Sequence, residues 1–292
     1  MKTIKVGLIG TGYMGKAHAI ALRSVPAVFD LSAKVECEML AEVNEQLAQD
    51  KAKELGFNRS TGDWLALVKD ENIDVVDICS PNYLHKEMAL AAIAAGKHVY
   101  SEKPLALNAT DALEMTLAAE KAGVKTLVGF NYVKNPASQL AKEIIGQGEI
   151  GKIVHFRGFH NEDYLSDPLT PFSWRLKREF SGSGALGDLG SHIINMAQFL
   201  VGDIASVNGD LQTVTATRPL ADNSGDVGQV ENEDQAHAMI RFQNGAIGTI
   251  ETSRIACGRK MGLSYEVTGT KGTILFDQER LAEIKLYIRD GN

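Results

Sequence analysis

A lysine that follows an expected buried strand has a position that indicates a catalytic role. Lys103 lies in the tripeptide Glu102-Lys103-Pro104, directly after the apolar segment His98–Ser101. Pro104 fixes its own φ angle and ends the strand. A lysine at the carboxyl end of a strand in an open α/β sheet points into the crevice where such sheets bind ligands. Lys103 is therefore a candidate catalytic residue.

Six residues near the N-terminus match the pattern G-x-G-x-x-G. The segment Gly10–Gly15 lies between an expected strand, Ile4–Ile9, and an expected helix over Ala17–Leu22. In this context glycines let the backbone approach a pyrophosphate, and the helix N-terminus stabilises its charge. The pattern predicts a dinucleotide-binding loop, with a purely structural glycine turn as the alternative. The expected cofactor contacts are Gly10, Gly12, Tyr13, Met14 and Gly15.

A dinucleotide-binding fold also needs an acidic residue after its second strand, to bind the ribose hydroxyls. The candidates are Glu36, Glu38 and Glu42. Only Glu42 lies at the carboxyl end of the expected strand, Val35–Ala41. A 2′-phosphate there would meet only negative charge, because neither Lys nor Arg occurs in the following Val43-Asn44-Glu45. The sequence therefore favours NAD over NADP.

Further loops at strand ends are placed to line the nicotinamide ribose. Ser80–His85 follows the expected strand Asp74–Cys79 and opens a helix. Asn131 and Tyr132 follow the expected strand Thr126–Gly129 and face the same crevice. His85 has an alternative role, as a helix-start residue that faces solvent. The cofactor contacts expected from these loops and from the lysine tripeptide are Ser80, Pro81, Asn82, His85, Glu102, Lys103 and Asn131.

A second group of residues that could take part in catalysis lies much later in the chain. Asp188 and His192 are four residues apart at the start of an expected helix, Leu189–Leu200, so both side chains project from one face. Histidine moves protons near neutral pH, and a nearby carboxylate orients the ring and favours its charged form. The glycines of Gly182–Gly190 would allow close approach to a ligand or to the other domain. The alternatives are a surface pair or half of a metal site, but no matching Cys or third His lies nearby.

Trp174 and Arg175 precede this helix in a loop that contains Pro168 and Pro171. An aromatic ring beside a guanidinium can stack on a polyhydroxylated ligand and donate hydrogen bonds to it. A packing role explains Trp174 equally well. The expected substrate contacts are Lys103, Tyr132, Trp174, Arg175, Asp188 and His192.

The order of the expected elements predicts an α/β protein with two domains. Strands alternate with helices over residues 1–130, which indicates a Rossmann NAD-binding domain with a parallel sheet. Residues 131–292 contain mostly strand candidates, which indicates an α+β domain with a largely antiparallel open sheet. Within it, Gln243-Asn244-Gly245 predicts a hairpin, because Asn-Gly supplies the positive φ values of tight turns. A strand is expected over Val207–Thr215, and the polar segment Arg218–Asn232 is expected to be a surface loop.

Composition excludes several classes of protein. The 292 residues have a net charge of −7, with 44% hydrophobic and 23% charged residues, which is ordinary for a globular protein and argues against a nucleic-acid partner. The apolar runs are only strand-length, so we expect neither a signal peptide nor a membrane partner, and a cytoplasmic location. Three widely spaced cysteines fit a reducing compartment and predict no disulfide framework and no metal site.

Six motifs that occur in order carry a resemblance to a known family. They are Gly10-x-Gly12-x-x-Gly15, Ser80-Pro81-Asn82-x-x-His85, Ala95-Gly96-Lys97-His98-Val99, Glu102-Lys103-Pro104, Gly129-Phe130-Asn131-Tyr132 and Gly187-Asp188-x-Gly190-x-His192. Together they resemble the glucose-fructose oxidoreductase / inositol dehydrogenase / MocA (Gfo/Idh/MocA) family, from residue 1 to at least Gly272. The second domain is similar to myo-inositol and levoglucosan dehydrogenase-like members in Glu233-Asp234, Asn244-Gly245-Ala246 and Gly269–Gly272.

The resemblance implies an NAD(P)-dependent oxidoreductase that oxidises a secondary alcohol of a sugar or cyclitol. It implies that Lys103, Asp188 and His192 are the catalytic set. His192 would accept the hydroxyl proton, Lys103 would polarise the substrate oxygen, and Asp188 would orient His192 or hold a neighbouring hydroxyl. It also implies a homo-oligomer, a dimer or tetramer formed through the C-terminal sheet. Family members usually continue beyond Asn292, so a C-terminal tail that completes the second domain is expected to be missing.

Two other functions fit the same scaffold. Tightly held NAD that oxidises a sugar transiently can drive elimination of a glycoside, with no net change in NADH absorbance. A regulatory sensor would bind NAD without turnover on any polyol. The joint presence of Lys103, Asp188 and His192 argues against the sensor, since a sensor needs none of them.

Overall fold

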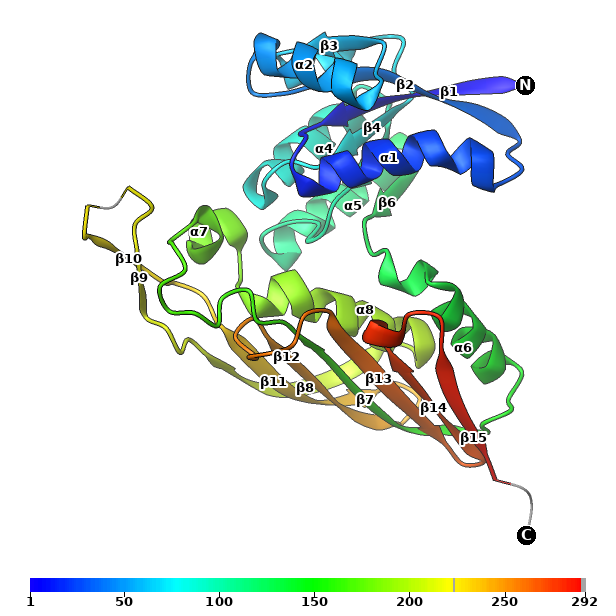
Figure 1. Cartoon of the computed structure of the whole chain (residues 1–292). Coiled ribbons are helices and arrows are strands. Elements are labelled where there is room, and N and C mark those ends of the chain that lie inside the picture. Colours follow the sequence, from blue (N-terminus) through cyan, green and yellow to red (C-terminus); the bar gives the residue numbers. More distant parts are fainter. Residues whose placement is uncertain (223, 290–292) are drawn as a thin grey trace. The chain divides into compact units, whose positions relative to one another are not determined.

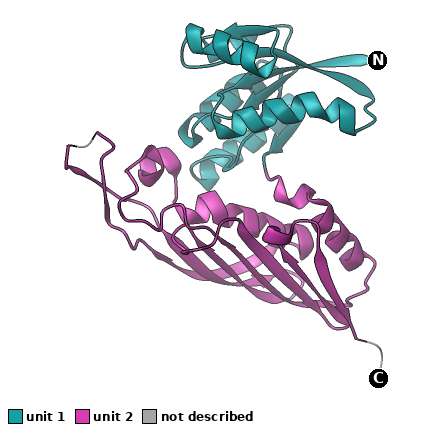
Figure 2. Cartoon of the chain, viewed as in Figure 1, with its two compact units in different colours: residues 1–129 teal, residues 130–292 magenta. Residues whose placement is uncertain are grey.

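The computed structural model describes residues 1–222 and 224–289, which divide into two compact units at Gly129 and Phe130 (Figure 2). Unit 1 is built from strands that alternate with helices (Figure 1). Its strands are β1 (Lys2–Ile9), β2 (Ala33–Ala41), β3 (Arg59–Thr61), β4 (Val75–Ile78), β5 (His98–Ser101) and β6 (Thr126–Val128). Its helices are α1 (Tyr13–Val28), α2 (Glu45–Leu55), α3 (Trp64–Lys69), α4 (His85–Ala94) and α5 (Ala109–Ala122), with the 3-10 turn η1 (Asn82–Leu84).

The described strands of unit 1 form one parallel sheet in the order β3-β2-β1-β4-β5-β6. Its central strands are apolar along most of their length and are buried, as in parallel sheets that carry helices on both faces; Leu8, Val76 and Ile78 are fully buried. The strand order reverses between β1 and β4, which is the switch point where doubly wound sheets bind ligands. The predicted Rossmann sheet is confirmed.

The helix ends of unit 1 follow local signals in the sequence. Asn44 caps α2 by accepting a hydrogen bond from the Leu47 N–H, and Gly56 ends that helix in the left-handed region. Gly96 follows α4 with a φ of 73°, in the left-handed region that a glycine at a helix end adopts readily. The short elements β3 and α3 were not predicted, because three and six residues are too few to show the period of a strand or a helix.

Unit 2 is dominated by a second sheet. Its strands are β7 (Ile153–Asn161), β8 (Ile204–Gln212), β9 (Thr217–Pro219), β10 (Val227–Gln229), β11 (Gln235–Phe242), β12 (Ile247–Ser253), β13 (Gly262–Gly269), β14 (Gly272–Asp277) and β15 (Ile284–Ile288). Its helical segments are η2 (Tyr132–Lys134), α6 (Pro136–Gly146), η3 (Trp174–Leu176), α7 (Arg178–Ser181), the π-helical η4 (Leu186–Gly190), α8 (Ser191–Leu200) and η5 (Gln278–Arg280).

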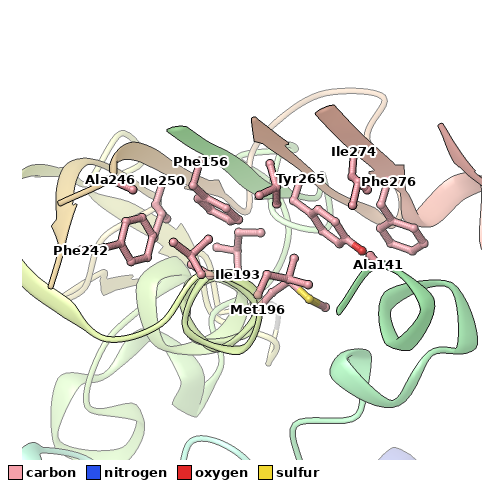
Figure 3. Packing of buried hydrophobic residues seen from close by; sticks show 14 of the residues in the cluster. Ala141, Phe156, Ile193, Met196, Phe242, Ala246, Ile250, Tyr265, Ile274 and Phe276 are labelled. Carbon is pink, nitrogen blue, oxygen red and sulfur yellow. The ribbon is translucent and has the colours of Figure 1, made fainter. Parts of the chain in front are cut away.

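Seven of the described strands form a sheet in the order β15-β14-β13-β7-β12-β11-β8. Its described pairings are antiparallel except that of β7 with β12. Helices α6 and α8 cover one face, and Ile193 and Met196 of α8 pack against Phe156 and Tyr265 of the sheet (Figure 3). The largely antiparallel sheet is therefore confirmed. The predicted hairpin is also present: β11 and β12 flank Gly245, whose φ is 89°.

Two predictions for unit 2 were wrong in detail. The expected surface loop Arg218–Asn232 contains the hairpin of β9 and β10, and both of its end residues are fully buried. Arg218 tolerates burial because its guanidinium donates to the carbonyl oxygens of Leu165 and Asp167, at 2.6 and 2.7 Å. Strand β8 was expected to reach Thr215, but it ends at Gln212. Beyond it, the N–H of Thr215 donates to the Asp234 carboxylate instead of to a neighbouring strand.

Among the described residues, no helix has the length and apolar character that crossing a membrane requires.

Candidate active site

The glycine-rich loop after β1 has the geometry of an anion-binding turn. Gly10 has a φ of 88°, and its N–H donates to the Ala41 carbonyl at 3.0 Å. A Cβ on Gly15 would lie 2.0 Å from the Gly10 oxygen, so only glycine fits there. A Cβ on Gly12 would meet no atom within 4 Å, so space remains at the N-terminus of α1. The first-turn N–H groups of a helix bind a pyrophosphate well in such a space.

Glu42 lies directly after β2 and is bound to the same loop. Its Oε1 accepts hydrogen bonds from the N–H and the hydroxyl of Thr11, at 2.6 and 2.5 Å. Its Oε2 accepts from the N–H of Val43 at 3.0 Å. The carboxylate therefore stands beside the turn that would hold the cofactor phosphates.

The other two acidic candidates on β2 have different partners. Asn58 donates to Oε1 of Glu36 and to Oε2 of Glu38, both at 3.0 Å. Arg59 also donates to Glu38, at 2.7 Å. Among the three carboxylates, Glu42 is the one whose described contacts include the glycine-rich loop.

His85 is buried and does not face solvent, so its solvent-facing alternative is wrong. Its Nδ1 lies 2.8 Å from the Pro104 carbonyl oxygen and its Nε2 lies 2.9 Å from that of Ser80. Burial lowers the pKa of His85, despite these two contacts. The ring thus connects the loop after β4 to the loop after β5. Other residues expected to contact a cofactor are half-buried or exposed in unit 1, namely Tyr13, Met14, Ser80, Pro81 and Asn82.

In the tripeptide that follows β5, Glu102 is buried inside unit 1 and Lys103 is half-buried. Glu102 is 5% exposed, and its Oε2 accepts a hydrogen bond from the N–H of Lys103 at 3.0 Å. The peptide bond between Lys103 and Pro104 is cis. A Cβ on Gly129 would lie 2.5 Å from Oε1 of Glu102, so the glycine after β6 makes room for this carboxylate.

In unit 2, Asp188 lies in the π-helical segment η4 and His192 in the first turn of α8. The sequence predicted one regular helix here, and the structure differs because the chain forms a π-helical turn first. Such turns are frequent at functional sites. His192 is buried, with its ring centroid 4.5 Å from that of Tyr132 and 5.6 Å from that of His160.

Tyr164 and His160 support this pair, and sequence reasoning missed both. The Tyr164 hydroxyl donates to Oδ2 of Asp188 at 2.8 Å. His160 lies with its Nδ1 3.1 Å from the Leu189 carbonyl oxygen. Sequence spacing gives no signal for either contact, since the partners lie far apart in the chain.

The glycines before Asp188 allow close packing within unit 2. A Cβ on Gly184 would lie 2.0 Å from the Glu233 carbonyl oxygen. The buried Glu233 carboxylate accepts hydrogen bonds from the N–H groups of Gly184 and Leu186, at 2.7 and 2.9 Å. Asn232, also buried, donates to the carbonyl oxygens of Arg175 and Ser183. These two residues hold both the π-helical segment and the loop before it.

Trp174 and Arg175 form a stacked pair at the start of that loop's 3-10 turn. The Arg175 Cζ lies 4.5 Å from the centroid of the Trp174 ring, within the range of a cation–π contact. The tryptophan is half-buried and the arginine is exposed. Asn131 is exposed, one residue before the half-buried Tyr132. Trp174 and Arg175 therefore place an aromatic ring beside a guanidinium, a pair that can stack on a ligand and donate hydrogen bonds to it.

Sequence models of protein families match both units. A model described as an oxidoreductase family with an NAD-binding Rossmann fold matches residues 4–130, and a model of the Gfo/Idh/MocA C-terminal domain matches residues 138–275. The chain belongs to the Gfo/Idh/MocA oxidoreductase family. The predicted resemblance is confirmed, and this Gfo/Idh/MocA protein is an oxidoreductase with an NAD-binding Rossmann domain.

Characterised relatives of this Gfo/Idh/MocA protein act on sugars and cyclitols. It is 42% identical to levoglucosan dehydrogenase of Pseudarthrobacter phenanthrenivorans, over 98% of this chain and 76% of that protein. It is 30% identical to myo-inositol 2-dehydrogenase of Thermotoga maritima, over 99% of this chain and 80% of that protein. A solved structure of levoglucosan dehydrogenase in complex with NADH and L-sorbose matches 100% of this chain and 78% of its own, with a TM-score of 0.97.

Proposed function

We propose that this protein is an NAD-dependent dehydrogenase that oxidises a secondary alcohol of a sugar or cyclitol. Residues 1–130 would bind NAD, and residues 131–292 would bind the substrate. The observation that carries the proposal is a half-buried lysine on the same sheet edge as a glycine-rich loop that fits a dinucleotide. The aspartate–histidine pair of unit 2 and the sugar-oxidising relatives support it.

Lys103, His192 and Asp188 would each have a different role in the oxidation. NAD, when bound, takes up the hydride that leaves the alcohol carbon. The Lys103 ammonium donates to the substrate oxygen and stabilises the charge that develops on it. His192 removes the hydroxyl proton as a general base, and the carbonyl forms as the proton and the hydride leave. Asp188, held by Tyr164, orients His192 or binds a neighbouring hydroxyl.

Three further residues would bind the sugar, and the loops of unit 1 would bind the cofactor. Trp174 would stack on the apolar face of the sugar ring, while Arg175 and Tyr132 would donate hydrogen bonds to its hydroxyls. Ser80, Pro81 and Asn82 would line the nicotinamide ribose, together with Asn131. His85 and Glu102 are buried, so we assign them to holding these loops.

The test is a spectrophotometric assay of NADH formation by the purified protein. It is run against a panel of cyclitols, aldoses and anhydrosugars, with NAD and NADP in parallel. Formation of NADH with a member of the panel supports the proposal. Product formation without net NADH favours the redox-assisted elimination, and NAD binding without turnover favours the sensor.

Glu42 is expected to set the preference for NAD. Glu42→Gln removes the charge but keeps an oxygen for the Thr11 N–H, so the loop is retained. Removing a carboxylate near a 2′-phosphate should lower the ratio of kcat/KM with NAD to that with NADP by about 10-fold. Steady-state kinetics with both cofactors measures the ratio. Glu36→Gln is the control, because Glu36 contacts Asn58 instead; wild-type activity with NADP alone would contradict the assignment.

We also propose that the face of the unit 2 sheet opposite α6 and α8 joins copies of the chain into a dimer or tetramer. Strand register puts the exposed Met239, Ile247, Leu275 and Tyr287 on this face. A hollow of about 520 Å³ on it is lined by residues of β7, β8, β11 and β12. Large apolar side chains that are exposed on one face of a sheet support an interface there.

Charges placed on this face are expected to separate the copies. The double variant Met239→Glu/Tyr287→Glu would bury two unpaired carboxylates in the interface, so its mass by sedimentation should fall to that of one chain. The matched control is Leu113→Glu, a similarly exposed apolar residue on α5 of unit 1. A wild-type protein that sediments as a monomer would rule out this interface.

A further inference from the structure

A buried histidine beneath the lysine loop has no part in the chemistry described above. His18 lies on α1, the helix that follows the glycine-rich loop, and is 8% exposed. Its Nδ1 lies 2.9 and 3.0 Å from the two oxygens of Asp77 on β4. Its Nε2 lies 3.1 Å from Oε1 of Glu102. Both ring nitrogens therefore face carboxylates, and an imidazole can donate to both only when it is protonated.

The neighbouring groups favour this charged ring. Burial lowers the pKa of His18, but the hydrogen bonds with Asp77, Cys79 and Glu102 hold it well above its ordinary value. Burial raises the pKa of Asp77, although the hydrogen bond with His18 opposes that shift. Burial raises the pKa of Cys79 to about 12, and it also raises that of Tyr100, whose ring stacks on the imidazole at 4.9 Å. The thiol and phenol are thus neutral, which leaves Asp77 and Glu102 as the acidic groups in contact with the two ring nitrogens.

The same contacts reach the catalytic loop. Glu102 uses Oε1 toward His18 and Oε2 to accept the hydrogen bond from the N–H of Lys103. One carboxylate therefore connects the ring to the backbone of the lysine. Without the ring, Asp77 and Glu102 would be left as two buried carboxylates with no cation between them, and such a pair repels strongly in a low-dielectric interior.

We propose that His18 is a positioning residue: its charged ring joins Asp77 to Glu102 and so fixes the backbone that presents Lys103 to the substrate. The inference rests on the proposed catalytic role of Lys103. Helix α1 would then have two roles. Its N-terminus would bind the cofactor phosphates, and its His18 would hold the lysine loop against β4.

A metal site is the competing explanation of the same cluster. Among the described residues, His18, Asp77 and Cys79 have ligand atoms close enough to share one ion. A metal would need a deprotonated ring nitrogen and a thiolate. The second carboxylate at Nε2 instead matches a ring that is protonated on both nitrogens.

The kinetic test is a double-mutant cycle between His18 and Lys103, read by single-turnover NADH formation. His18→Gln should slow turnover about 10-fold or more when Lys103 is present, and by less than about 3-fold in a Lys103→Ala background, because coupled residues are not additive. Equal slowing in both backgrounds overturns the proposal. His98→Gln is the matched control, an exposed histidine of the same unit.

A second variant distinguishes loss of positioning from loss of folding. His18→Gln/Asp77→Asn removes both the cation and one carboxylate, so it should fold better than His18→Gln alone and recover part of the lost turnover. Thermal unfolding and single-turnover rates measure the two effects. If the double variant is less stable and slower than His18→Gln, repulsion between the carboxylates is not the cause.

The charge of the ring is tested without any turnover. In ¹⁵N NMR spectra, assigned by their loss in His18→Gln, both His18 nitrogens should stay protonated from pH 6 to 9. A neutral ring, or stoichiometric zinc in the purified protein, overturns the proposal. If Lys103→Ala keeps full turnover, the proposed function of Lys103 fails instead, and the NMR result still reports on His18 separately.

Discussion

Replacing Lys103 by alanine is expected to slow the oxidation by about 10²–10³-fold, the usual loss when one donor to a developing oxyanion is removed. The substrate oxygen becomes negative as its proton leaves ahead of the hydride, and the ammonium group stabilises that charge more in the transition state than in the ground state. The loop itself should persist, because its hydrogen bond to Glu102 comes from the backbone N–H and not from the side chain.

Two measurements separate catalysis from cofactor binding in this variant. NAD affinity, measured by fluorescence titration, should change by less than about 3-fold, while kcat falls with kcat/KM, as for a contact made mainly in the transition state. Lys121→Ala, an exposed lysine at the end of α5, is the control. If NAD affinity collapses in Lys103→Ala, the lysine is mainly a cofactor ligand and the proposed role is wrong.

Local patterns in the sequence were sufficient to predict that the candidate residues of unit 1 follow strands that end at one edge of its sheet. The glycine-rich loop, Glu42 and Lys103 each follow a recognisable strand. Parallel strands end at one edge of a sheet, so residues after β1, β2 and β5 must come close together once the strands are found. The contact of Glu42 with Thr11 fits this logic directly.

The same reasoning failed where polar residues are buried. Arg218, Asn232 and Glu233 look like surface residues in the sequence, since charged and amide side chains are mostly exposed. In the structure each is buried because its hydrogen bonds go to backbone groups of distant segments. Those partners cannot be found from spacing along the chain.

The buried polar residues matter for the site as well as for the fold. Glu233 binds the N–H groups that precede Asp188, and Asn232 binds the Arg175 carbonyl. Similarly, His85 ties Ser80 to Pro104 in unit 1. The sequence motifs therefore mix residues that face a ligand with residues that support them, and the contacts in the structure are needed to tell the two apart.

Replacing His192 by alanine is expected to lower kcat by about 10²–10⁴-fold, which is the usual contribution of a general base. The variant should also respond to added imidazole, because the missing ring leaves a space bordered by the rings of Phe130, Tyr132 and His160. Rates of NADH formation at increasing imidazole concentration measure this rescue, with Lys103→Ala as the variant that imidazole should not restore.

Milder changes around His192 distinguish proton transfer from packing. Tyr164→Phe removes only the hydrogen bond to Asp188, so it should slow turnover far less than His192→Ala while leaving the thermal stability nearly unchanged. His98→Gln, at an exposed histidine of unit 1, is the control and should match the wild type. Wild-type turnover in His192→Ala would remove the histidine from the mechanism. Loss of stability in that variant, without imidazole rescue, would reduce its role to packing against Tyr132.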